Sequence, residues 1–582
     1  MLAFKPEPLA RRSASLDEAG VETPRAAVDG MRSIEASKPR PLLRIPPFPG
    51  ARARAFAQPS AEPFPMADAE VEALIAAMRS QKVGGDYWGS QPPLPEVPYV
   101  LVHAADFDGA AELMGGARVL RWLDRPSGLP SLHAHTVTGA CDPWHLLGGA
   151  SLVIADADDE LVLLACIAGV PVQCIGTGAF QALAGEPAAS TLREAFRTHV
   201  IDAFSYVDPY SGEPISFAQA LQCCAFWRRL IDSNRDIDGA VGFAFWKRAT
   251  VAPLLWRGSD EVPFLSDGRT VRKGQRIAIW KARTPPAVIS HLEARDVQLI
   301  EVEDGFIRSV GLGADCVPPL SIVVDRAGVH FDPNQPSELE DLLQNGAFSP
   351  DILDGARKLR ALIVESGVSK YGSGRAPLDR RDVARRHILV PGQVEDDRAV
   401  VSGGAGLTSN LELLRRVRAQ APDAYLLYKP HPDVEAGHRT GAIPDELCLS
   451  LADEIVRDEP ISALLDLVDE VHVNSSLAGF EALLRGKAVT THGVPFYAGW
   501  GLTRDLGPVP ARRTAKRTLD ELVAAVLLLY PRYLDPVTGL PCPADVLVRR
   551  LAEGPEARGM IIRLRRLQGR CRRGLSALRK WR

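Results

Sequence analysis

The chain has 582 residues, of which 46% are apolar and 24% charged, and its formal net charge is −4. This length predicts about three to four packing units, and the net charge excludes binding to nucleic acid through overall charge. No apolar run approaches the ~20 residues of a membrane-spanning helix, and no signal-peptide pattern opens the sequence, so we expect a cytoplasmic protein. Nine scattered cysteines without a CxxC pair argue against a structural zinc site and favour a reducing compartment.

Residues 1–65 are rich in Pro, Ala, Arg and Ser and show no sustained hydrophobic period. The stretch "KPRPLLRIPPFPGARARAF" has too many prolines for a helix or a sheet, so we predict a disordered leader over 1–65. An organelle transit peptide is disfavoured because acidic residues come early, at Asp17, Glu18 and Glu22.

An internal repeat organises the rest of the chain. "DPWHLLGGASLVIADADDELVLLACIAGVPVQCIG" (142–176) aligns without gaps with "EPISALLDLVDEVHVNSSLAGFEALLRGKAVTTHG" (459–493), and residues 191–215 align with 518–542. A weaker match pairs 100–116 with 388–404. Three matches in the same order indicate a duplication.

The two copies differ in their polar residues. The second copy has Ser475, Ser476 and Glu481 where the first has Asp158, Asp159 and Leu164. The first copy also lacks counterparts of "EDGFIRS" and "YKPHPDVEAGHR". We therefore predict a degenerate, shortened module over 66–235 and a working module over 236–550.

Short apolar runs alternate with helical patterns within the working module. The expected strands are 276–280, 297–302, 320–325, 387–392, 424–432, 470–475 and 488–493, and the expected helices include 336–345, 409–420 and 476–486. This alternation predicts an α/β fold with parallel sheets and two Rossmann-like subdomains, 236–380 and 381–550, facing a cleft. Polar motifs directly follow the apolar runs, so we expect them to point into this cleft.

The first polar motif is "VEDGFIRSVGLGADCVPPLSIVVD" (302–325). It carries Glu303, Asp304, Arg308 and Ser309 between two apolar runs, and we predict a structured loop between strands. Charge buried in a loop is costly unless it is paired, so such a loop favours chemistry over packing.

The second motif is "HILVPGQVEDDRAV" (387–400), with Gln393, Glu395, Asp396 and Asp397 after an apolar run. Clustered carboxylates raise some of each other's pKa values unless a cation lies nearby. A displacement reaction needs an ionised carboxylate as nucleophile or base. An acidic turn that caps a helix is equally compatible with this pattern.

Two further motifs suit anions. In "YLLYKPHPDVEAGHR" (425–439), prolines present Lys429 and His431 at the end of a strand, as for a phosphate or carboxylate; an ordinary proline turn is the alternative. In "EVHVNSSLAGFEALLRG" (470–486), Ser475 or Ser476 would begin a helix whose free N–H groups bind anions, and Glu481 could take a ribose diol. A plain helix cap is the alternative here.

Two segments towards the C-terminus remain. "THGVPFYAGWGLTRD" (491–505) is rich in Gly and aromatic residues, which either stack on sugars or bases or fill gaps in the core. Residues 551–582 form a basic amphipathic tail, which suits an anionic membrane surface. A solvated charged tail is the alternative, and a nucleic-acid tail ranks third.

Together the motifs resemble the KpsC-type capsule polysaccharide biosynthesis proteins, which are retaining transferases of β-linked 3-deoxy-D-manno-oct-2-ulosonic acid (Kdo). The resemblance covers residues 236–545. Members commonly carry two transferase modules in tandem, which agrees with the repeat, although the first module here is shortened. The resemblance implies a GT-B-like cleft that takes CMP-Kdo and a lipid-linked acceptor, either a phospholipid or a Kdo-terminated lipid.

The resemblance also implies residue roles. Asp397 would be the nucleophile, with Asp396 as its nearest competitor, and Glu303 and Asp304 would meet acceptor hydroxyls or the proton. The expected substrate-binding residues are Arg308, Ser309, Gln393, Lys429, His431, Ser475, Ser476 and Glu481. No metal or cofactor is expected, because cationic side chains and helix N–H groups would meet the donor's charges.

The implied location is the cytoplasmic face of the bacterial inner membrane, where the basic tail would hold the enzyme peripherally. Other capsule assembly proteins are candidate partners, and nucleic acid is not. Two alternatives stay open: a non-catalytic capsule assembly or export factor, and a related transferase that uses another nucleotide sugar.

Overall fold

The computed structural model describes residues 40–554, apart from 53–54, 61, 105–117, 124–134, 308–316, 370–371, 374–377 and 438. Most of the predicted leader and of the predicted tail, together with Arg308 and Ser309, lie outside the described residues. Among the described helices, none has the length and apolarity that crossing a membrane requires.

The second subdomain is built on a six-stranded, fully parallel sheet in the order β18-β17-β16-β19-β20-β21. These strands are β16 (His387–Pro391), β17 (Tyr425–Lys429), β18 (Glu454–Ile455), β19 (Glu470–Val473), β20 (Ala488–Thr491) and β21 (Arg504–Asp505). Numbered along the chain, the order is that of a Rossmann fold, in which strand order reverses between the first and fourth strands. The predicted strands of this half are confirmed.

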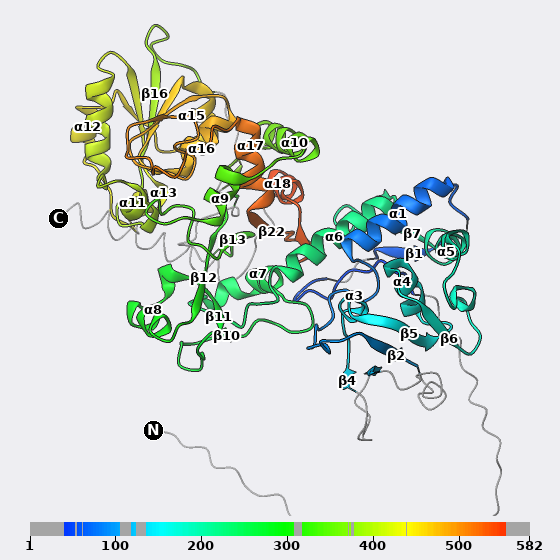
Figure 1. Ribbon diagram of the computed structural model, residues 1–582. Coiled ribbons are helices and arrows are strands. Elements are labelled where there is room, and N and C mark those ends of the chain that lie inside the picture. The colour runs from blue at the N-terminus through cyan, green and yellow to red at the C-terminus, as the bar shows by residue number, and fades with distance from the viewer. Residues whose placement is uncertain are drawn as a thin grey trace, which may run out of the picture. The chain divides into compact units, whose positions relative to one another are not determined.

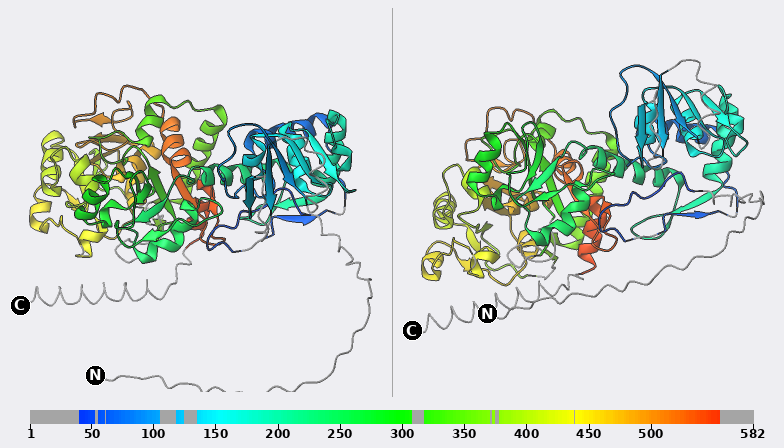
Figure 2. Two further views of the ribbon diagram at one scale, coloured as in Figure 1. Left: turned by 60° about the horizontal axis from the view of Figure 1, so that its bottom comes forward. Right: turned by 90° about the horizontal axis from the view of Figure 1, so that it is seen from below.

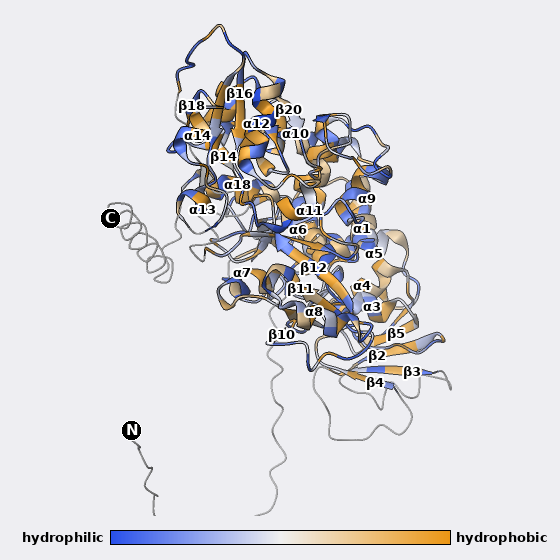
Figure 3. Cartoon of the chain, turned by 90° about the vertical axis from the view of Figure 1, so that its left-hand side faces the viewer, coloured by the Kyte–Doolittle hydropathy of each residue, from blue (hydrophilic) through white to orange (hydrophobic). Residues whose placement is uncertain are grey.

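Helices cover both faces of this sheet. Ile388 and Val390 pack with residues of α12, whereas Leu389 belongs to the core cluster that contains α15 and α16. These helices are α12 (Asn410–Gln420), α15 (Ile461–Leu467) and α16 (Leu477–Leu484), and Figure 1 shows β16 between α12 and α16. Because successive strand residues point to opposite faces, a strand covered on both faces is a continuous apolar run. The strands are accordingly coloured mostly as hydrophobic in Figure 3.

The first subdomain has a seven-stranded mixed sheet in the order β10-β9-β11-β12-β13-β22-β23. The strands are β9 (Gly239–Val241), β10 (Phe264–Leu265), β11 (Arg276–Ile279), β12 (Gln298–Asp304), β13 (Ser321–Asp325), β22 (Pro531–Leu534) and β23 (Pro541–Cys542). The first four in chain order pair in parallel, with α7 (Phe245–Leu255) packed on one face and α8 (Pro286–Glu293) on the other.

The end of the chain returns to the first subdomain. β13 pairs antiparallel with both β12 and β22, and β23 pairs antiparallel with β22. In Figure 2 the orange-to-red segment with β22 and α18 (Ala544–Ala552) lies against green elements of this subdomain. The expected all-parallel sheet and the expected subdomain range 381–550 are therefore wrong at this end, because residues 531–542 complete the other sheet.

The structure also corrects the loop expected over residues 302–325. Glu303 and Asp304 are the last two residues of β12, where they lie opposite Val323 and Ile322 of β13. Because β13 pairs with β12 as far as Asp304, β12 extends beyond its apolar residues and includes Glu303 and Asp304. The strand therefore fixes the backbone of both carboxylates.

The first copy has the fold of the second subdomain. Its parallel sheet has the order β4-β3-β2-β5-β6, which matches β18-β17-β16-β19-β20 strand for strand. These strands are β2 (Tyr99–His103), β3 (Val119–Leu123), β4 (His135–Thr138), β5 (Ala150–Asp156) and β6 (Val172–Ile175). Asp159 caps α4 (Glu160–Ala168) as Ser476 caps α16. The duplication is confirmed, and the first copy retains one Rossmann-like subdomain.

Part of the predicted leader belongs to this first module. Leu43, Phe48 and Phe56 are buried, and β1 (Ala57–Pro59) pairs antiparallel with β7 (Phe204–Val207). A disordered leader extending to residue 65 is therefore wrong for residues 41–52 and 55–60. The prolines prevent regular structure, but the apolar residues between them pack into the core.

We expect Leu43→Ala to lower the free energy of unfolding by about 2–5 kcal/mol, because it removes a fully buried side chain and leaves a cavity. Urea denaturation measures this change. Leu449→Ala, at a residue that is 53% exposed, is the control and should change stability by less than about 0.5 kcal/mol. Equal effects of both substitutions would show that residues 41–52 add nothing to the core.

Candidate active site

A cavity of about 950 Å³ lies between the two subdomains. The carboxyl ends of β12, β16, β17 and β19 line it, together with the segments that follow them. Strand order in the second subdomain reverses between β16 and β19, and ligands of open α/β sheets bind at such a point. The motifs expected to share one cleft are therefore brought together.

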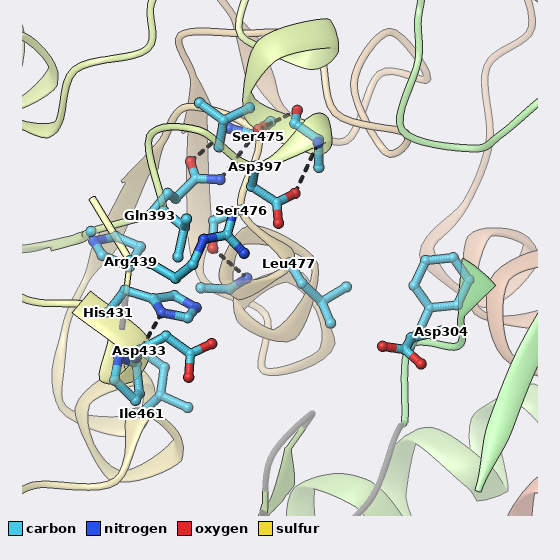
Figure 4. A pocket seen from close by; sticks show the side chains of 18 of the residues that line it. Asp304, Gln393, Asp397, His431, Asp433, Arg439, Ile461, Ser475, Ser476 and Leu477 are labelled. Atoms are coloured by element: carbon cyan, nitrogen blue, oxygen red, sulfur yellow. Dashed lines mark hydrogen bonds between the residues drawn. The ribbon is translucent and has the colours of Figure 1, made fainter. Parts of the chain in front are cut away.

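Asp397 lies at the start of α11 (Arg398–Gly403) and lines the cavity. Its Oδ1 accepts a hydrogen bond of 2.9 Å from the backbone N–H of Ala399. In Figure 4 its carboxylate points into the cavity. Asp397 is thus a helix cap, as the structural interpretation of the motif predicts, and a cavity residue at once.

The neighbouring carboxylates have partners of their own. Asp396 accepts hydrogen bonds from Thr440 Oγ1 (3.0 Å) and Arg439 Nη2 (3.2 Å). Both contacts lower the pKa of Asp396, and the bond from Thr440 has the larger effect. Glu395 accepts from the backbone N–H of Asn410 at 2.8 Å. Asp396 has a side chain that is 58% exposed and does not line the cavity, which separates it from Asp397.

Gln393 connects the two central strands. Its Oε1 accepts from the backbone N–H of Ser475 (3.0 Å) and its Nε2 donates to the Ser475 hydroxyl (3.2 Å). The same hydroxyl donates to the carbonyl of Ala399 at 3.0 Å. Gln393 and Ser475 therefore fix α11, and with it Asp397, relative to the sheet.

The next wall of the cavity suits an anion. Ser476 caps α16 by accepting from Ala478 N–H at 3.2 Å. Lys429 donates to the carbonyl of Arg457 at 3.1 Å, and burial lowers its pKa. His431 Nδ1 accepts from Asp433 N–H at 3.1 Å, which leaves Nε2 to carry the proton of the neutral ring. Ser476 is therefore both a helix cap and a cavity residue, and the binding of an anion by this wall stays a prediction.

Glu481 is buried and lines the cavity within α16. It lies within the second turn of the helix that Ser476 caps. The expected contact of Glu481 with a ribose diol stays a prediction.

The opposite wall carries Glu303 and Asp304. Asp304 Oδ1 lies 3.1 Å from Lys247 Nζ, and Glu303 Oε1 lies 2.8 Å from Arg398 Nη1. Burial, reinforced by the charge of Asp304, raises the pKa of Glu303 to about 8. Figure 4 shows Asp304 across the cavity from Asp397. A carboxyl group that titrates near neutral pH suits proton transfer.

The sequence matches the family described as capsule polysaccharide biosynthesis protein over residues 275–380 and 376–533. The capsule polysaccharide modification protein LipA of Neisseria meningitidis serogroup B is 38% identical over 372 residues, which are 62% of this chain and 53% of that protein. Two solved structures of Thermosulfurimonas dismutans KpsC are also similar, and each match covers 54% of this chain and 98% of the solved chain. The beta Kdo 2,7 transferase is 34% identical with a TM-score of 0.44, and the beta Kdo 2,4 transferase is 31% identical with a TM-score of 0.48. Residues 275–533 of the chain are thus similar to the capsule polysaccharide biosynthesis protein family.

This match confirms the resemblance found in the sequence motifs. The two family matches lie in the working module, and the two facing Rossmann-like subdomains confirm the predicted GT-B-like fold. The chain spans about half the length of LipA.

Two charged residues of this site were missed in the sequence. Lys247 follows β9, another strand of the parallel set, and its Nζ lies 3.2 Å from the centroid of the Trp280 ring. Arg398 directly follows Asp397 and contacts Glu303. The short strand β9 is not among the predicted strands, so Lys247 had no signal in the sequence, and the contact of Arg398 crosses between subdomains.

The aromatic loop over residues 491–505 packs into the core. Tyr497 and Trp500 are fully buried, and the Tyr497 hydroxyl donates to the carbonyl of Ser476. The interpretation that these two rings stack on a sugar or base is therefore wrong. They instead support the beginning of α16, and Phe496 beside them lines the cavity.

Within the described part of the chain, no three His, Cys, Asp or Glu side chains form a group suited to a metal ion. The absence of a metal in the reaction stays a prediction.

Proposed function

We propose that this chain is a glycosyltransferase of capsule polysaccharide biosynthesis that transfers Kdo from CMP-Kdo to a lipid-linked acceptor with retention of configuration. The observation that carries the proposal is the position of Asp397 in the cavity, beside an anion-suited wall and across from Asp304 (Figure 4). Glu303, next to Asp304 on β12, also lines the cavity. The names of the KpsC structures, which are Kdo transferases, support the donor sugar.

In the first step a carboxylate oxygen of Asp397 bonds to the anomeric carbon of Kdo. The bond from that carbon to the phosphate oxygen breaks, and its electron pair leaves with CMP. Lys429, His431 and the N–H groups at the start of α16 offset the phosphate charge. Glu481 takes the ribose hydroxyls, and Arg308, outside the described residues, takes the donor's carboxylate. This arrangement requires no metal.

In the second step an acceptor hydroxyl attacks the anomeric carbon of the adduct. Ionised Glu303 takes the hydroxyl proton, Asp304 orients the acceptor, and the bond to Asp397 breaks to regenerate its carboxylate. Each step inverts the anomeric centre, so the product retains the donor's configuration.

Intact-protein mass spectrometry after incubation with CMP-Kdo tests the proposal. The wild-type chain should gain the mass of one Kdo and lose it when a Kdo-terminated lipid is added. No adduct and no release of CMP in the presence of the acceptor would favour the non-catalytic assembly or export factor. An adduct formed only with a different nucleotide sugar would favour the related transferase.

The proposal places the enzyme on the cytoplasmic face of the inner membrane, with other capsule assembly proteins as partners. The basic segment within 551–582 supports this location through its attraction to anionic lipid. We expect removal of residues 555–582 to reduce cosedimentation with phosphatidylglycerol vesicles by about tenfold while adduct formation from CMP-Kdo stays unchanged. Equal cosedimentation of the full chain and the shortened chain would show that the tail does not hold the enzyme at the membrane.

A further inference from the structure

Arg398 joins the two subdomains at the cavity. It lies on α11 of the second subdomain, and its guanidinium contacts two carboxylates of β12 in the first. Nη1 lies 2.8 Å from Glu303 Oε1, and Nη2 lies 2.6 Å from Glu301 Oε1. Residues two apart on a strand point to the same face, so a planar fork reaches both carboxylates at once.

The surroundings hold this guanidinium in place. Its Cζ lies 5.1 Å from the centre of the Phe331 ring, a favourable cation–π distance. Glu301 is 4% exposed, and its other oxygen lies 2.7 Å from Lys281 Nζ. A buried carboxylate with two cationic partners is a fixed anchor rather than a mobile surface group.

The other end of α11 is also tightly packed. A Cβ at Gly403 would lie 3.1 Å from the carbonyl oxygen of Phe331 and 3.3 Å from Ser475 Cβ. The Gly403 carbonyl accepts a 2.7 Å hydrogen bond from Val494 N–H. Little space is therefore left for α11 to move between the subdomains.

We propose that Arg398 is a positioning residue that sets the placement of the Glu303 carboxylate relative to the Asp397 carboxylate. The inference rests on the proposed function, which names Asp397 as nucleophile and Glu303 as base. Asp397 caps α11 and Arg398 is its first residue, so one short piece of backbone carries both groups. The contact of the Arg398 guanidinium with Glu303 thereby fixes the distance between the nucleophile Asp397 and the base Glu303.

The charges around Glu303 make the role measurable. Glu303 is faced by Asp304 and Glu301, which raise its pKa, and by Arg398 and Lys247, which lower it. Loss of Arg398 leaves two carboxylates and one cation beside Glu303. Its pKa should then rise further, which a residue that only stabilises the fold would not cause.

The test compares Arg398→Gln with Arg398→Lys and measures the two steps separately. Adduct formation is followed by mass spectrometry with CMP-Kdo alone, and adduct discharge is followed with acceptor across a pH series. We expect Arg398→Gln to form the adduct, to discharge it about 10²-fold more slowly and to shift the apparent pKa of discharge upward. Lysine restores the charge but not the fork, so Arg398→Lys should recover the pKa while discharge stays slow.

Arg416→Gln is the matched control, because Arg416 makes a 3.0 Å ion pair with Glu412 on the surface of α12, away from the cavity. It should leave both steps unchanged. Wild-type discharge rate and pH profile in Arg398→Gln would overturn the inference. Circular dichroism of each variant shows whether a loss reflects unfolding.

Failure of the proposed function can be distinguished from failure of the inference about Arg398. If the wild-type chain forms no adduct, the proposed function fails and the catalytic part of the inference fails with it. A double-mutant cycle of Arg398→Gln with Glu303→Gln on the unfolding midpoint then decides the contact itself. Non-additive effects support the connection between the subdomains, and additive effects overturn it.

Discussion

Replacing Asp397 with Asn should abolish the covalent Kdo adduct and lower transfer by about 10³-fold or more, because an amide is not a competent nucleophile. Asn is as good a helix cap as Asp, so the hydrogen bond to Ala399 N–H and the beginning of α11 should survive. The loss is therefore expected without a loss of stability. Intact mass after incubation with CMP-Kdo, together with CMP release in the presence of acceptor, measures both effects.

Asp396→Asn is the matched control in the same motif. Asp396 pairs with Thr440 and Arg439 and does not line the cavity, so adduct formation should stay near the wild-type rate. An adduct that persists in Asp397→Asn but disappears in Asp396→Asn would transfer the nucleophile to Asp396. An adduct in both variants would place the nucleophile elsewhere.

Replacing Glu303 with Gln should slow adduct discharge by about 10²–10⁴-fold while leaving adduct formation intact, so the adduct should accumulate. A general base acts in its ionised form, and burial raises the pKa of Glu303 to about 8. Wild-type discharge should therefore rise with pH and level off above about 8. In Glu303→Gln this rise should be absent. Rapid-quench measurements of discharge across the pH series test both expectations.

The same pKa has a consequence for stability. The pKa of Glu303 is raised from its ordinary value of 4.5, so folding favours the protonated carboxyl group. Its contribution to stability is complete below that ordinary value and is lost as pH rises through about 8. Glu412→Gln, at a surface ion pair, is the control for the pH dependence of adduct discharge and for the pH dependence of the free energy of unfolding. A discharge profile in Glu303→Gln that keeps the wild-type rise would assign the base to another group, with Asp304 as the first candidate.

Much of the second subdomain could be predicted from the sequence. Its central strand β16 is covered on both faces, so it stands out as an apolar run, and a polar motif follows at its carboxyl end. Asp397, Ser475 and Lys429 were located in the cavity by this reasoning. The helix-cap alternatives are confirmed for Asp397 and, of the two serines, for Ser476.

The remaining features depend on contacts that are distant in the sequence. β13 and β22 are more than 200 residues apart, and no local pattern reveals that they pair antiparallel. The partner of Arg398 lies in the other subdomain, so its charge had no visible function in the sequence. The prolines near Leu43 concealed a packed segment, because proline content is a signal of absent regular structure and not of absent burial.

The return of the chain to the first subdomain limits how the cavity can open. The chain crosses between the subdomains twice, once after α10 (Pro350–Ser366) and once before α17 (Leu519–Val523). Two covalent connections between the subdomains favour a hinge rotation about the axis through both connections. They resist translation of one subdomain along the other and rotation about any other axis. A single proteolytic cut at either crossing should therefore leave the halves attached, while giving the hinge rotation more freedom.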